Sequence, residues 1–267
     1  MPPVQTIGAA TLDALAYIGG LARLSASAVR AAFADIFSHR RLAYGRAVHQ
    51  AMVCGVGSLP ILSLITFFIG TILALQAAYE LRKFGALQFV ADAVAISVSR
   101  ELGPLITAIL VIGRSGSSFA AELGTMKVNE EIDAMETMAL DPIRFLVAPK
   151  LCAMLLMMPC LTIWADFMGF VGGSVFGVAA AGFTFTTYIR ATVSALVLRD
   201  IVTGLVKSLM FGLVITAVGC QEGLRTGLGA EEVGRSTTAA VVKSIFLVIM
   251  VDLVFTAMFY FGIGAGK

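Results

Sequence analysis

Long apolar stretches recur along the chain and predict five membrane-spanning helices. A helix needs about 20 mostly apolar residues to cross the hydrocarbon core of a bilayer. Stretches of this length lie at about residues 48–78, 87–112, 145–181, 201–220 and 238–262. The third is longer than one upright crossing requires, so we expect it to tilt or to begin in the interface. The pattern predicts an all-α integral membrane protein.

The chain ahead of these stretches has a different pattern. Residues 12–37 place apolar side chains at roughly helical spacing, with Arg23 and Arg30 between them. This spacing favours an amphipathic helix that lies in the membrane interface, and a helix packed on the bundle is the alternative. We therefore divide the chain into an interfacial region, residues 1–47, and a transmembrane domain, residues 48–267.

The distribution of Lys and Arg between the predicted loops indicates the orientation. The loops on the same side as the N-terminus contain most of these residues, among them Arg114 and Lys127. Because basic loops tend to remain in the cytoplasm, the sequence predicts a multi-pass protein with a cytoplasmic N-terminus. The loop between the second and third spans then also lies in the cytoplasm.

That loop contains the acidic segment KVNEEIDAMETMALDP, which runs from Lys127 to Pro142. Its apolar residues fall on one face of a helix: Val128, Ile132, Met135, Met138 and Ala139. Such spacing predicts a short amphipathic helix across the cytoplasmic end of the bundle. Two interpretations follow, a helix that is merely solvated by its charges and a docking surface for a partner protein with basic residues. The two Met residues favour the second, because Met suits adaptable contact surfaces.

The ends of this predicted helix are marked by particular residues. Asn129 is the expected N-cap, and Glu130 and Glu131 then lie in the first turn, where the helix dipole favours acids. Asp141 and Pro142 are expected to end the helix.

Six charged residues interrupt the apolar stretches: Arg100, Glu101, Asp166, Lys207, Lys243 and Asp252. A charge at the bilayer centre costs at least about 2.5–3.5 kcal/mol, so such residues usually face a bundle interior or a wet cavity. We predict that Glu101 and Lys207 approach each other across the second and fourth spans. The alternative is that each charge reaches a nearby interface, and we prefer this alternative for Asp166, Lys243 and Asp252.

Proline and glycine in the spans predict two packing features. Pro104 removes a backbone donor, so the second span should be irregular there. Gly169, Gly173 and Gly177 recur every four residues in the third span and should allow another helix to come close.

Composition excludes several classes of protein. The mean hydropathy of +0.93 is too high for a soluble domain. A net charge of +2 without a dense basic run indicates no nucleic-acid partner. The four Cys residues are scattered singly, so we expect core residues and no metal site. The chain has no phosphate loop of the form GxxxxGK[ST] and no recognisable catalytic motif, so we expect no enzyme activity.

The run RELGPLITAILVIGRSGSSFAAELGTMKVNEEIDAMETMALDPIRFLVAPK, which starts at Arg100, strongly resembles the MlaE/YrbE permease family. Further similarity lies in LALQ from Leu73, GGSVFGV from Gly172, LVKSLMFG from Leu205 and GRSTTAAVV from Gly234. The resemblance covers about residue 45 to the C-terminus. Members of this family are the membrane subunits of ABC transporters that work with Mce-domain proteins.

The resemblance implies an assembly in the bacterial inner membrane. It contains a homodimer of the permease, two cytoplasmic ATPase subunits that bind ATP and Mg, and a periplasmic Mce-domain protein, expected to be hexameric. No cofactor is expected in this chain. The implied function is phospholipid transport between the inner and outer membranes of a Gram-negative envelope, which maintains the lipid asymmetry of the outer membrane.

The resemblance also assigns roles to residues. It implies that the acidic helix is the coupling helix that docks on the ATPase, through Asn129, Glu130, Glu131, Ile132, Asp133, Met135, Glu136, Met138 and Leu140. It implies a substrate pathway that includes Leu75, Tyr79, Arg100, Glu101 and Lys207. The individual charges of the acidic helix do not transfer from the family, because this segment is more acidic than in some members.

Other functions remain as alternatives. An Mce-type system for sterol-like or other lipids would share this architecture. A proton-coupled secondary transporter would use Glu101, Lys207 or Asp252 as a relay, but the spans show no internal repeat. A structural scaffold would need the cytoplasmic helix and no charged cavity.

Overall fold

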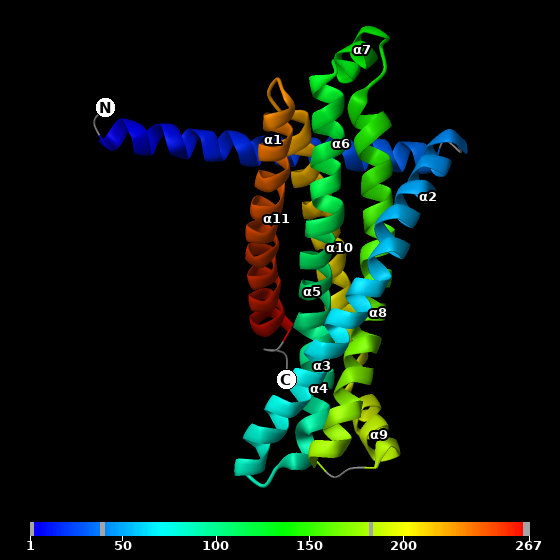
Figure 1. Ribbon diagram of the computed structural model, residues 1–267. Helices are drawn as coiled ribbons and strands as arrows, with labels where there is room; N and C mark the ends of the chain where they lie inside the picture. Colours follow the sequence, from blue (N-terminus) through cyan, green and yellow to red (C-terminus); the bar gives the residue numbers. More distant parts are fainter. Residues whose placement is uncertain (1–2, 38–40, 182–183, 264–267) are drawn as a thin grey trace.

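The computed structural model describes residues 3–37, 41–181 and 184–263, and every regular element in these ranges is a helix. Figure 1 shows a long bundle with one helix, α1 (Pro3–Phe37), lying across it. The remaining elements are α2 (Arg41–Gly55), η1 (Val56–Ser58), α3 (Leu59–Lys83), η2 (Leu87–Phe89), α4 (Val90–Ser97), η3 (Val98–Leu102), α5 (Gly103–Val111), η4 (Ile112–Gly116), α6 (Ser117–Val128), α7 (Glu131–Thr137), η5 (Ile143–Val147), α8 (Ala148–Ala181), α9 (Phe185–Ala195), α10 (Leu198–Leu224), α11 (Ala230–Met258) and η6 (Phe259–Ile263).

Five helical runs are long and apolar enough to cross a membrane, which confirms the predicted number. They are Gly45–Lys83, Leu87–Val128, Ile143–Ala179, Leu198–Leu224 and Ala230–Phe261. The second run continues well beyond residue 112, where the sequence pattern predicted its end. The segment that follows residue 112 is rich in Gly and Ser, yet it remains helical. It forms a π-helical turn, η4, which leads directly into α6.

Helix α1 lies roughly perpendicular to the spans, near the end of the bundle that carries α7 (Figure 1). Its second half packs on the bundle through Leu24, Ala28 and Ala32, which are buried. Its first half extends beyond the bundle and exposes Leu12 and Leu15. The alternative of a helix packed on the bundle therefore holds for the second half of α1. The first half of α1 presents an apolar face of the kind that suits a membrane interface.

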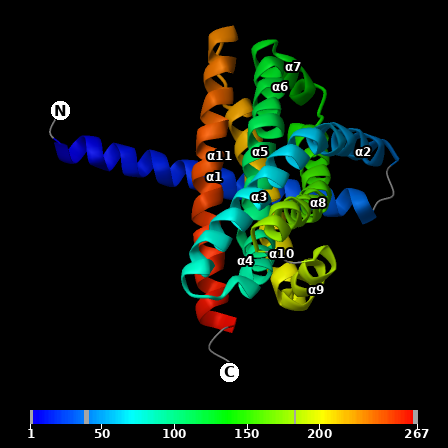
Figure 2. The same ribbon diagram turned by 60° about the horizontal axis from the view of Figure 1, so that its bottom comes forward.

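The tightest crossing in the fold joins α3 and α8, which run side by side in Figures 1 and 2. A Cβ atom added at Gly70 would overlap the backbone of Gly169, and one added at Gly172 would overlap the carbonyl of Phe67. The Thr71 hydroxyl donates a hydrogen bond to the carbonyl oxygen of Gly172 across this crossing, at 3.1 Å. The close approach predicted for Gly169 is therefore confirmed.

The other two glycines of that pattern meet a different element. Gly173 and Gly177 lie against Tyr188 of α9, whose side chain is buried. Gly173 also lies close to Val94 of the second span and to the carbonyl of Gly70 in the first, so the predicted close approach holds for it as well, whereas Gly177 makes room for the aromatic ring alone.

The irregularity expected near Pro104 takes the form of a π-helical turn. Residues Val98–Leu102 form η3, and the N–H of Gly103 donates to the carbonyl oxygen of Val98, five residues earlier. Pro104 then lies in the first turn of α5, where no backbone donor is needed. π-Helical turns of this kind occur often at functional sites, and this one carries Arg100 and Glu101.

Candidate functional site: a buried charged cluster and the exposed face of α7

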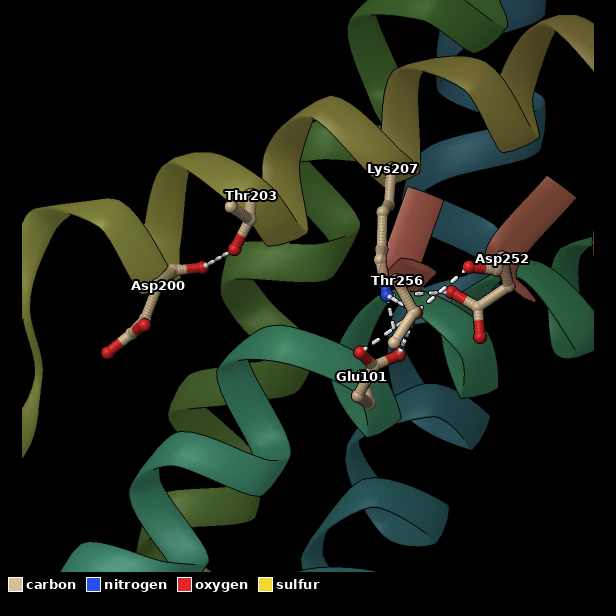
Figure 3. Close-up of polar contacts among 6 residues, drawn as sticks. All are labelled: Glu101, Asp200, Thr203, Lys207, Asp252 and Thr256. Atoms are coloured by element: carbon tan, nitrogen blue, oxygen red, sulfur yellow. Dashed lines mark hydrogen bonds and ion pairs between the residues drawn. The ribbon is translucent and has the colours of Figure 1, made fainter. Parts of the chain in front are cut away.

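The side chain of Lys207 lies at the centre of a polar cluster within the apolar bundle (Figure 3). Its Nζ atom lies 2.5 Å from Oε2 of Glu101 and 2.9 Å from Oδ1 of Asp252. It also donates a hydrogen bond to the Thr256 hydroxyl at 2.8 Å. Three elements, η3, α10 and α11, thus contribute to one site.

This geometry explains how a lysine is accommodated among apolar helices. Lys207 is 1% exposed, and a buried ammonium group is costly unless it is paired and hydrogen-bonded. The Thr256 hydroxyl completes the cluster, since it also lies 3.1 Å from Oε1 of Glu101. With both carboxylates ionised, the cluster has one formal negative charge in excess.

The predicted approach of Glu101 and Lys207 is confirmed by this contact. The preference for an interfacial Asp252 was wrong, because its side chain is 16% exposed and pairs with Lys207. The reason is register, since one turn of α11 brings both Asp252 and Thr256 to the face that meets Lys207.

The neighbouring residue Arg100 belongs to a second pair. Its Nε atom lies 2.5 Å from Oδ1 of Asp200, whose side chain is 1% exposed. The other oxygen of Asp200 accepts a hydrogen bond from the N–H of Val197, the N-cap residue of α10. Asp200 was not among the candidates from the sequence, although an acid in the first turn is a known signal for the start of a helix. About half of the Arg100 side chain remains exposed beside this pair.

The remaining pathway candidates, Leu75 and Tyr79, do not join the charged cluster. Both are exposed side chains on α3. The ring of Tyr79 lies 4.4 Å from Nζ of Lys83. Their assignment to a substrate pathway stays a prediction.

The other two charges expected near an interface have different surroundings. Nζ of Lys243 lies 2.8 Å from Oε2 of Glu222, so α11 pairs with α10 at this level. Asp166 lies against Gly103 in the second span, and its Oδ1 atom has no hydrogen-bond partner among the described residues. The interfacial interpretation was wrong for Asp166, because the missing side chain of Gly103 makes room for it in the interior. For Lys243 it stays a prediction, since this side chain is 44% exposed and its Nζ lies 4.5 Å from the ring centroid of Tyr17 in the crossing helix α1.

The acidic segment forms a helix shorter than predicted. Asn129 is the last residue before the chain turns, because its N–H donates to the carbonyl oxygen of Thr125 in α6. Glu130, with φ of 60°, is the N-cap of α7 instead. The expectation of Asn129 as N-cap was wrong, since the turn between α6 and α7 is too tight to leave it free. Nζ of Lys127 lies 2.6 Å from Oδ1 of Asp133 and ties the two helices together.

Helix α7 also ends before Asp141. The N–H of Leu140 donates to the carbonyl oxygen of Met135, and Ala139 adopts a φ of 58°. This is the Schellman pattern, in which a left-handed residue closes the helix. Ala139 closes α7 without a glycine, which is why the sequence did not reveal the end.

The two large apolar residues of α7 face the protein and not the solvent. Ile132 is 4% exposed and Met135 is 8% exposed. Met138 and Leu140 are exposed beyond the end of the helix. The free face of α7 carries, besides these two, Asn129, Glu130, Glu131, Asp133 and Glu136. A docking partner would therefore meet acids and two apolar side chains, and not Ile132 or Met135.

Comparison with known proteins agrees with this architecture. The model of the family described as permease MlaE matches residues 47–258. A probable ABC transporter permease protein of Rickettsia typhi is 40% identical over 213 residues, which is 80% of this chain and 82% of that protein. A probable ABC transporter permease protein of Synechocystis is 36% identical over 217 residues, 81% of this chain and 82% of that protein.

A third relative has a more specific name. The intermembrane phospholipid transport system permease protein MlaE of Haemophilus influenzae is 36% identical over 222 residues, which is 82% of this chain and 83% of that protein. The family match covers the three middle spans, nearly all of the first and fifth, the charged cluster and α7. The chain is therefore a multi-pass membrane protein that belongs to the MlaE permease family.

Proposed function

We propose that this chain is the permease subunit of an ABC transporter that moves phospholipid between the inner and outer membranes of a Gram-negative envelope, and so maintains lipid asymmetry. The observation that carries the proposal is the 36% identity to the Haemophilus influenzae phospholipid permease over nearly the whole transmembrane domain. The buried charged cluster supports it, because an amphiphilic substrate needs apolar walls with a few polar groups.

The partners follow from the same proposal. Two copies of the chain bind two cytoplasmic ATPase subunits, which hold ATP and Mg, and a periplasmic Mce-domain protein. Hydrolysis takes place on the separate ATPase chain, since this sequence contains no phosphate-loop motif. Helix α7 is the coupling helix, and its exposed acidic face docks on basic residues of the ATPase.

Coupling runs through the second span. Helix α7 follows α6 directly, and α6 continues through η4 and α5 to η3, which carries Arg100 and Glu101. Movement of α7 by the ATPase is thereby transmitted to the contact between Glu101 and Lys207. Release of that contact changes the polar site offered to a phospholipid headgroup, and Arg100 supplies positive charge for the headgroup phosphate.

The orientation in the inner membrane follows as well. Helices α1 and α7 lie at the same end of the bundle (Figure 1). This end faces the cytoplasm in the proposed transporter, which agrees with the excess of Lys and Arg in the loops on this side.

A proton-coupled transporter is the second candidate, because the cluster of Glu101, Lys207 and Asp252 offers carboxylates buried in a membrane domain. Transfer of a fluorescent phospholipid between reconstituted vesicles separates the two. We expect transfer to require the ATPase subunit and ATP. Transfer driven by a pH gradient, in vesicles without the ATPase, would overturn the ABC proposal. Replacing the phospholipid by a fluorescent sterol tests the alternative substrate class.

A further inference from the structure

An open pocket of about 210 Å³ lies between the first half of α2, the middle of α6 and the junction of η5 with α8. None of the residues of the charged cluster lines it. Its walls are formed by Gly45, Arg46, His49, Gln50, Glu122, Leu146, Pro149 and Lys150. A single water needs only about 10–15 Å³ of such space. The pocket is therefore large enough for a polar group well beyond one solvent molecule.

The charges of this pocket are held in fixed positions. Lys150 is 1% exposed, and its Nζ atom lies 2.5 Å from Oε2 of Glu122. The same ammonium group lies 5.0 Å from the ring centroid of Phe119. An ammonium group has three donors, and the carboxylate of Glu122 accepts one of them.

Arg46 supplies the second positive charge. Its Nη1 atom donates a hydrogen bond to the backbone carbonyl oxygen of Phe145 at 3.1 Å. Its guanidinium carbon lies 3.7 Å from the centroid of the Phe145 ring. Of the side chains that line the pocket, Arg46 and Lys150 are cationic and Glu122 is anionic. A compact anion fits this balance, and a guanidinium beside an ammonium group suits the oxygens of a phosphate.

The surroundings of the pocket distinguish an amphiphile from a free anion. Arg46, His49, Gln50 and Val53 form one face of α2, since they lie three to four residues apart. Val53 is 49% exposed, so this face becomes apolar one turn beyond the polar wall. Leu156, two turns into α8, is also exposed. The start of α2, which carries part of the pocket lining, lies near the level at which α1 crosses the bundle (Figure 1).

We propose that this pocket binds the phosphate of a resident phospholipid, with the acyl chains on the apolar strip formed by Val53 and Leu156. Arg46 and Lys150 face the phosphate. The bound lipid adds a further contact between α2 and the start of α8, which already pack against each other. The site is separate from the charged cluster and does not depend on the proposed transport function.

The test is a thermal unfolding measurement on the full chain in detergent. Three probes are added in turn: dihexanoyl phosphatidylglycerol, dihexanoylglycerol and sodium phosphate. A ligand that binds only the folded state raises the unfolding midpoint. We expect phosphatidylglycerol to raise it and the other two probes to leave it unchanged. An equal rise with sodium phosphate would indicate a free anion and overturn the lipid assignment, and an equal rise with dihexanoylglycerol would overturn the phosphate site.

Variants locate the effect in the pocket. Gln50→Glu adds a carboxylate to the wall without touching the contact between Arg46 and Phe145, so we expect it to abolish most of the rise. Arg46→Gln should do the same, although it also lowers the starting midpoint. Arg235→Gln removes an exposed charge at the same end of the bundle and should retain the rise. A rise that survives Gln50→Glu would overturn the proposal.

Native mass spectrometry gives a second readout, independent of unfolding. The chain purified from vesicles of phosphatidylglycerol and phosphatidylethanolamine should retain a phospholipid adduct. We expect this adduct to be lost in Gln50→Glu and kept in Arg235→Gln. Because both readouts measure binding, a failure of phospholipid transfer in vesicles would leave this result unaffected.

Discussion

Nζ of Lys207 lies 2.5 Å from Oε2 of Glu101, although 106 residues separate them in the sequence. The contact joins the middle of the fourth span to the π-helical turn of the second. Asp252 reaches the same nitrogen from the fifth span. Three spans are therefore held together by one ammonium group.

Removal of that ammonium group should destabilise the protein. Lys207→Met leaves the carboxylates of Glu101 and Asp252 close to each other without a cation. Loss of one partner from a buried ion pair costs about 3–5 kcal/mol, and the partial exposure of Glu101 reduces this figure. We expect a lower thermal unfolding midpoint in detergent, partly recovered when Glu101→Gln and Asp252→Asn are added. A triple variant as unstable as Lys207→Met would contradict this account.

A charge swap should work only with a third change. In Glu101→Lys combined with Lys207→Glu, the new carboxylate at position 207 lies beside Asp252. We therefore expect little recovery of phospholipid transfer from the double variant, and more when Asp252→Asn is added. The measurement is ATP-dependent transfer in reconstituted vesicles, and recovery in the double variant alone would show that Asp252 is unimportant.

The two faces of α7 should respond differently to substitution. Glu136→Lys combined with Met138→Asp alters the exposed face, so we expect it to reduce co-purification of the ATPase while the permease remains folded. Ile132→Asp places a charge at a buried position and should lower the unfolding midpoint of the permease itself. If the ATPase still co-purified normally with the variant that combines Glu136→Lys and Met138→Asp, the acidic face would not be part of the docking surface.

The crossing of α3 and α8 should not tolerate a methyl group at Gly172. Gly172→Ala brings Cβ onto the carbonyl of Phe67, so the helices must separate or the backbone must shift. We expect a clear fall in the unfolding midpoint. Gly234→Ala is the matched control, because nothing lies within 4 Å of the added Cβ. That change should leave the free energy of unfolding unchanged or raise it by about 0.5–1 kcal/mol, because alanine is more favourable than glycine inside a helix.

Tyr188 should make the fold sensitive to alkaline pH. Burial raises the pKa of Tyr188, outside the five spans, to about 12. Its folded pKa then exceeds the unfolded value of about 10, so the stabilisation is complete below pH 10 and is lost as pH rises toward 12. The hydroxyl has no hydrogen-bond partner among the described residues. We expect Tyr188→Phe to lose less stability than wild type between pH 9 and 11, and equal losses would contradict this assignment.

The sequence predicted the parts of this molecule that depend on composition and periodicity. Apolar length predicted five spans, and the cost of a charge in lipid predicted that Glu101 and Lys207 would meet. The pairing of Asp252 depends on how far α11 is rotated about its axis, which no local pattern determines. The same holds for the burial of Lys150 near the start of α8, which no local pattern in the sequence determines.

The ends of α7 depended on backbone conformations that composition conceals. Glu130 and Ala139 both adopt positive φ without being glycine. Such residues cost conformational energy, and only the surrounding contacts make them stable. Sequence reasoning therefore placed a helix here correctly and misjudged its caps and its free face.

The second span, Leu87–Val128, contains 42 residues in one nearly continuous helical run. At 1.5 Å per residue it is roughly 60 Å long, about twice the thickness of the hydrocarbon core. Even with its headgroups, a bilayer covers only about 40–45 Å of that length. The span must therefore extend beyond the headgroups, and in the proposed transporter the part at the α7 end would hold a docked ATPase clear of the lipid surface.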